Sequence, residues 1–103
     1  MIKVTPSAIL KLKALIVEHP KDPIVRVSVN DLDDHRIGFS ITLEESTQPD
    51  DEVRHIDGLT IAVEGQSVSR MDGITLDYQE PGGFKFHHPE PPEEFKLDLF
   101  NLN

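Results

Sequence analysis

The stretch DEVRHIDGLTIAVEGQSVSRMDGITLDY, residues 51–78, carries most of the information on the fold. Two short segments, EVRHI and LTIAV, flank Asp57-Gly58, a dipeptide preferred in type I′ turns. They are therefore predicted to form a β-hairpin. The segment between Ala62 and Asp72 has room for a short helical turn, and ITLDY at the end of the stretch predicts another strand.

An amphipathic helix is predicted upstream of this hairpin, over about residues 6–18. Thr5 suits the N-cap because its side-chain oxygen can accept hydrogen bonds from exposed backbone N–H groups, and Pro6 at the first helical position loses no needed donor. Apolar side chains then recur at three- and four-residue spacing, on one face that must pack on a core: Ile9, Leu12, Leu15 and Ile16. Pro20 ends the helix.

Alternating apolar residues predict further strands on both sides of the hairpin. The segment from Ile24 is one, the segment from Phe39 is a second, and GFKF, after a Gly82-Gly83 turn, is a third. The expected fold is α+β, a twisted β-sandwich or partial barrel of about six to seven short strands with one N-terminal helix and a short second helix. The core-facing strand residues would be Val25, Val27, Val29, Phe39, Ile41 and Leu43.

The composition restricts the function. A chain of 103 residues suits one domain. Ten Lys and Arg against nineteen Asp and Glu give a net charge of −9, which repels nucleic-acid phosphates and anionic lipids, so neither partner is expected. No window approaches the roughly 18 apolar residues that span a bilayer, so the expected location is the cytoplasm. The absence of cysteine excludes disulfides, thiolate metal sites and thiol nucleophiles.

The sequence contains no motif typical of an enzyme. A Gly-rich phosphate loop and a nucleophile elbow are both absent, so we expect a non-enzymatic protein. His19 follows the predicted helix, where an imidazole favours the helix dipole, and His55 falls on the solvent side of the hairpin. The other histidines, His35, His87 and His88, would suit iron, zinc or manganese together with carboxylates only if they converge in the fold.

The order of the segments resembles the A-type iron–sulfur carrier family, also called HesB/IscA-like. VTPSAILKLKAL is similar to the family's opening helix, IVRVSV to the strand before its first ligand loop, and GFSITLEE to the strand after that loop. The stretch 51–78 is similar to the central block, and GGFKFHHP to the closing strand. The resemblance covers nearly the whole chain and implies an HesB/IscA-like domain over residues 1–92.

The resemblance fails at the cysteines that hold the family's cluster. The first family cysteine falls at Asp34, and the two cysteines of the cysteine-glycine-cysteine motif fall at Phe95 and Leu97. Iron–sulfur clusters are held chiefly by thiolates, and the side chains of Phe95 and Leu97 have no donor atom. We therefore expect no cofactor, and in particular no iron–sulfur cluster bound through the usual ligands. Residues 93–103 become an apolar C-terminal tail.

Two functions follow. The first is a protein-interaction or regulatory role in which the tail contacts an unidentified protein partner, as a strand or as a helix; the tail could equally extend the domain's own core. The resemblance also implies a homo-oligomer. The second is a mononuclear iron or zinc site at Asp34, His35, His87 and His88, although Arg36 would repel the cation. The predicted interaction residues are Phe95, Leu97, Leu99, Phe100 and Leu102.

Overall fold

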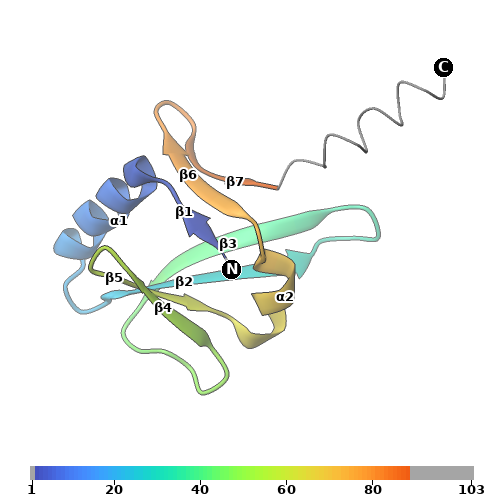
Figure 1. Cartoon of the computed structure of the whole chain (residues 1–103), viewed down its shortest axis with the longest axis horizontal. Coiled ribbons are helices and arrows are strands. Elements are labelled where there is room, and N and C mark those ends of the chain that lie inside the picture. Colours follow the sequence, from blue (N-terminus) through green and yellow to red (C-terminus); the bar gives the residue numbers. More distant parts are fainter. Residues whose placement is uncertain (1, 89–103) are drawn as a thin grey trace.

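The computed structural model describes residues 2–88, which form two β-sheets and three helical segments (Figure 1). The α+β class, the N-terminal helix and the short second helix are confirmed. The strands are β1 (Lys3–Val4), β2 (Ile24–Asp31), β3 (Ile37–Glu44), β4 (Glu52–Ile56), β5 (Leu59–Val63), β6 (Thr75–Gln79) and β7 (Gly83–His87). The helical segments are α1 (Pro6–Glu18), η1 (Gly65–Ser67) and α2 (Val68–Met71).

The four-stranded sheet has the order β3-β2-β5-β4, with β2 and β5 in its centre. β2 is antiparallel to β3 over its whole length but parallel to β5 only over residues 24–27. β4 and β5 form the predicted hairpin, and Asp57 and Gly58 have φ angles of 49° and 86°. Two successive positive φ angles are what a type I′ turn requires, so the Asp-Gly dipeptide explains this connection.

The three-stranded sheet has the order β1-β6-β7. β1 is only two residues long and pairs in parallel with β6, so that Lys3 lies opposite Thr75. The sequence did not predict it, because two residues are too few for an alternating pattern. β6 and β7 are antiparallel neighbours, as expected for two strands joined by a glycine turn.

Helix α1 begins where its cap predicts and covers both sheets. The Thr5 side chain accepts a hydrogen bond of 3.2 Å from the backbone N–H of Ala8. Its apolar face packs mainly on β6 and also on β5, with Ala8 and Leu12 fully buried. The helix ends at Glu18, and the C-cap residue His19 donates its backbone N–H to the carbonyls of Leu15 and Ile16.

The core lies between the two sheets and the inner face of α1. Its buried residues are apolar except for Ser67, the single polar residue among residues 2–88 that is buried as a whole. The side chain of Asp51 is also enclosed, although the residue as a whole is only half-buried. No helix in this described part of the chain has the length and apolarity needed to cross a membrane. The buried apolar residues are Ile2, Ala8, Ile9, Leu12, Val25, Val27, Val29, Leu59, Ile61, Ala62, Val63, Met71, Ile74 and Leu76.

Candidate functional site

Asp34 and His35 lie in the turn that joins β2 to β3. Asp33 organises this turn: its Oδ1 accepts the backbone N–H groups of His35 and Arg36 at 2.9 Å each, and its Oδ2 accepts Nε of Arg36 at 2.7 Å. The His35 N–H and the Arg36 guanidinium hold the pKa of Asp33 below its usual range. Asp34 and His35 are both exposed, so a turn locked by Asp33 and Arg36 presents them to solvent.

His87 and His88 lie at the end of β7, on a different sheet from the turn. Nε2 of His87 is 3.8 Å from Oδ2 of Asp77 on β6. The His88 ring lies edge-on to Phe39 of β3, with 5.9 Å between ring centroids. Phe39 also stacks on Phe86 at 4.5 Å, so aromatic rings join β3 to β7 across the two sheets.

The predicted metal ligands do not assemble into a metal site. Within residues 2–88 no group of three or more His, Cys, Asp or Glu side chains could hold a metal ion. This range includes all four predicted ligands: Asp34, His35, His87 and His88. The predicted interaction residues Phe95, Leu97, Leu99, Phe100 and Leu102 lie outside the described residues.

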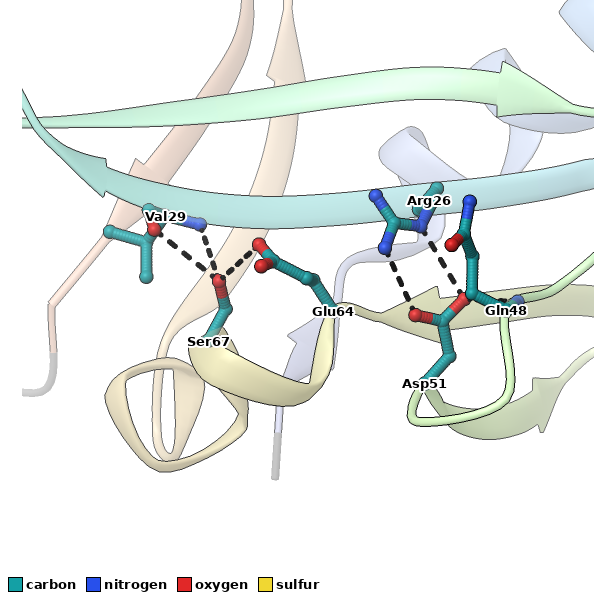
Figure 2. Close-up of polar contacts among 6 residues, drawn as sticks. All are labelled: Arg26, Val29, Gln48, Asp51, Glu64 and Ser67. Carbon is teal, nitrogen blue, oxygen red and sulfur yellow. Dashed lines mark hydrogen bonds and ion pairs between the residues drawn. The ribbon is translucent and has the colours of Figure 1, made fainter.

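Ser67 anchors the helical segment to the centre of the larger sheet (Figure 2). Its hydroxyl accepts the backbone N–H of Val29 at 2.9 Å and lies 3.3 Å from the Val29 carbonyl oxygen and 3.1 Å from Oε2 of Glu64. β5 pairs with β2 only as far as Val27, so Ser67 supplies a polar partner where the sheet ladder has ended. The sequence predicts a helical turn in this segment, but no sequence pattern distinguishes Ser67 from the other serines.

Asp51 and Arg26 fasten the loop before β4 to β2 (Figure 2). Nη2 of Arg26 lies 3.1 Å from Oδ1 of Asp51, whose side chain is 0% exposed. The second carboxylate oxygen of Asp51 accepts the backbone N–H of Gln48 at 2.9 Å. Both oxygens are therefore occupied within the fold, which makes this pair a structural clamp.

A cavity of about 380 Å³ opens between the β4–β5 hairpin and α2. Its apolar wall comes from Ile2, Val63, Val68 and Met71, and its polar rim from Glu52, Arg54, Ser69 and Asp72. At the rim, Arg54 is paired with Glu52 at 2.7 Å. The sequence does not predict the cavity, because its lining comes from four separate segments and no local pattern brings these together.

The fold and the segment order identify the family. The sequence model of the family described as iron-sulphur cluster biosynthesis matches residues 1–92. The chain belongs to this family. It is a family of non-catalytic proteins, in agreement with the prediction of a non-enzymatic protein.

Relatives within the iron–sulfur cluster biosynthesis family support the assignment. An uncharacterized protein in the nifU 5′ region of Cereibacter sphaeroides is 31% identical over 94 residues, which cover 86% of this chain and 88% of the relative. The crystal structure of IscA with a [2Fe-2S] cluster has a TM-score of 0.75 at 26% identity, covering 86% of each chain. Escherichia coli SufA, described as involved in the biosynthesis of iron–sulfur clusters, has a TM-score of 0.78 at 25% identity, covering 89% of this chain and 83% of SufA.

The residues of this chain do not suit an iron–sulfur cluster as cargo. The chain has no cysteine anywhere in its sequence, so the thiolate ligands that such clusters ordinarily need are absent. At the turn of the β2–β3 hairpin, the residue that the family resemblance aligns with the first cysteine is the exposed carboxylate Asp34. This member of the family therefore lacks the usual ligands for a cluster.

Proposed function

We propose that this chain is a non-catalytic interaction protein of iron–sulfur cluster biosynthesis, which acts in the cytoplasm by binding another protein instead of carrying a cluster on cysteines. The observation that carries the proposal is the combination of a family fold with a TM-score of 0.75 to IscA and a sequence without one cysteine. A chain that keeps the family fold but lacks the cluster-binding cysteines can still bind other proteins through its surfaces, although it cannot hold a cluster on thiolates.

The proposed contact is the apolar tail, in which Phe95 and Leu97 stand where the family resemblance places cysteines. Five larger apolar side chains within residues 95–102 are more than an acidic, solvated terminus needs. The partner class we propose is a cysteine-bearing member of the same family. IscA, which is similar to this chain, has been crystallised with a [2Fe-2S] cluster, and SufA is described as involved in cluster biosynthesis.

The alternative of a mononuclear iron or zinc site gains no support from the geometry. Asp34 and His35 belong to the hairpin turn, whereas His87 lies near Asp77 and His88 against Phe39. Within residues 2–88, no third ligand joins any pair of these side chains into a site. The interaction role is therefore the better hypothesis.

Calorimetric titration of this protein with a purified cysteine-bearing IscA-type protein, both apo and cluster-loaded, tests the proposal. We expect measurable binding by the wild type and its loss in a variant carrying Phe95→Ser, Leu97→Ser and Leu99→Ser. The matched control carries Leu10→Ser and Val17→Ser on α1, where the two side chains are 71% and 79% exposed. Absence of wild-type binding, or equal weakening by both variants, would overturn the proposal.

A further inference from the structure

The β2–β3 hairpin extends beyond the end of β5, the strand that pairs with the other edge of β2 (Figure 1). β2 pairs with β3 as far as Asp31, opposite Ile37, but with β5 only as far as Val27. The inner face of this extension carries Val29, Phe39 and Ile37, because residues opposite each other or two apart on antiparallel strands share a face. Asp31, opposite Ile37, lies on the same face, where its carboxylate is paired with Arg70. Exposure rises along it, from 5% at Val29 through half-buried Phe39 to 38% at Ile37.

The outer face of the same hairpin carries a second exposed apolar residue. A Cβ atom placed on Gly38 would lie 3.1 Å from Cδ2 of Leu32, so Leu32 packs over Gly38. Gly38 alternates with Ile37 and Phe39 along β3, so Leu32 lies on the side opposite the inner face. Leu32 is 61% exposed, and it therefore serves as a matched apolar control within one hairpin.

The described chain ends beside the inner face. Phe86 of β7 stacks on Phe39 with 4.5 Å between ring centroids, and the next residue but one, His88, contacts Phe39 edge-on at 5.9 Å. β7 is an edge strand of its sheet. The chain therefore leaves β7 within two strand positions of Ile37, which lies about 7 Å from Phe39 along β3.

We propose that residues 95–102 of the same chain pack on the inner face of the hairpin, over Ile37 and Phe39. Fifteen residues follow His88, and the seven steps from His88 to Phe95 can span up to roughly 23 Å, ample for the distance involved. This packing holds the tail on its own domain, so that a partner protein would have to displace the tail in order to bind it. It refines the proposed function, yet it holds or fails whether or not a partner exists.

The charges indicate that this contact is apolar. The hairpin end carries three aspartates, Asp31, Asp33 and Asp34. Residues 95–102 carry one lysine and one aspartate, Lys96 and Asp98, and two acids, Glu93 and Glu94, precede them. Asp31 is paired with Arg70 at 2.9 Å and Asp33 with Arg36 at 2.7 Å, which lowers the repulsion but leaves no positive excess. Added salt screens like charges, so docking should become tighter between low and physiological ionic strength.

The cysteine-free sequence allows a direct test by paramagnetic relaxation. A spin label on Asn101→Cys is the sole thiol adduct in the full-length chain. We expect NMR signals of Ile37, Phe39 and Phe86 to lose most of their intensity, and more so on raising salt. A mixed sample is the control: one protein carries the spin label but only ¹⁴N, and the other carries ¹⁵N but no spin label. The ¹⁵N signals should keep their intensity in this mixture, because the proposed contact is within one chain.

Three further variants connect the loss of signal to the inner face and to the tail. Ile37→Ser should restore the signals of Phe39 and Phe86, whereas Leu32→Ser on the outer face should leave them broadened. Leu97→Ser with Leu99→Ser in the tail should also restore them without touching the folded domain. Signal loss only in the mixed sample, signal loss at the cavity beside Met71 instead, or no loss anywhere would each overturn the proposal.

Discussion

Asp51 lies in a hydrophilic stretch of the sequence, yet its side chain is completely enclosed. Burial alone would raise the pKa of this carboxyl, but the hydrogen bonds from Arg26 and from the Gln48 N–H outweigh burial and hold the pKa below its usual range. The unfolded chain therefore binds this proton more tightly than the native one. Stability from Asp51 is fully present above about pH 4 and is lost as pH falls through the lower native pKa.

Asp51→Asn removes this charge while nearly preserving the shape of the side chain. At neutral pH we expect a loss of about 2 kcal/mol in the free energy of unfolding, because Arg26 keeps its charge without a charged partner. The difference from wild type should shrink as pH falls below about 4 and through the lowered native pKa, where the native aspartate itself becomes protonated. Urea unfolding measured from pH 7 to pH 2 checks this. The exposed Asp34→Asn is the control, and equal pH profiles for all three proteins would contradict the clamp.

Ser67→Ala tests the link between the helical segment and β2. The backbone N–H of Val29 would lose its side-chain partner in a buried position, so we expect a loss of roughly 2 kcal/mol in stability. Ser69→Ala, at an exposed position two residues further on, should change stability by much less. Chemical denaturation of both variants measures the difference, and amide exchange at Val29 should accelerate only in the first. A similar cost for the two serines would refute the role of Ser67.

Among the secondary-structure elements, those with strong local signals were predicted well. The cap and the proline defined α1 from Pro6 to Glu18, and Asp57-Gly58 defined the β4–β5 hairpin. Strand β1 was not predicted, because its two residues are recognisable as a strand only by their pairing with β6. The predicted metal ligands do not converge in the described fold. Asp34 lies in the turn of the β2–β3 hairpin and His87 on the other sheet, and no local sequence pattern reveals how the two sheets pack.

The start of α1 depends on a contact with the neighbouring sheet as well as on its own cap. Thr5 caps the N–H of Ala8 and also donates to Oδ1 of Asp77 at 2.7 Å, while Ser7 donates to the same oxygen at 3.0 Å. Hydrogen bonds from the two hydroxyls hold the pKa of Asp77 below its usual range, and the bond from Thr5 has the larger effect. The helix is thereby fixed to β6 at its first turn.

Thr5→Ala should remove both functions of this side chain. We expect a loss of roughly 1 to 2 kcal/mol in stability, as for other N-cap deletions, and a rise in the pKa of Asp77 toward the ordinary aspartate value. Thermal unfolding gives the first quantity and NMR titration of the carboxyl carbon gives the second. Thr5→Ser retains the hydroxyl and should stay close to wild type in both. An unchanged Asp77 titration in Thr5→Ala would show that the contact with β6 is weak.

At the scale of the whole molecule, the fold stands without the ligands that its family uses. The two sheets are joined by α1 and by the stacking of Phe39 on Phe86, and both contacts are made from ordinary side chains. The chain therefore lacks the usual cluster ligands but keeps the helices and strands of the described fold. It follows that cluster binding should be separable from folding in this chain.

Returning three thiols to the aligned positions tests this separation. In the variant with Asp34→Cys, Phe95→Cys and Leu97→Cys, we expect anaerobic incubation with iron and sulfide to yield a protein-bound iron–sulfur chromophore that survives desalting, because thiolates are the ligands such clusters need. Wild type should yield none. The matched control places three cysteines at Leu10, Val17 and Val53, which are 71%, 79% and 38% exposed. If the two triple variants bind equal iron and sulfide, positions 34, 95 and 97 are not the counterparts of the family's ligands, and the tail must be aligned anew.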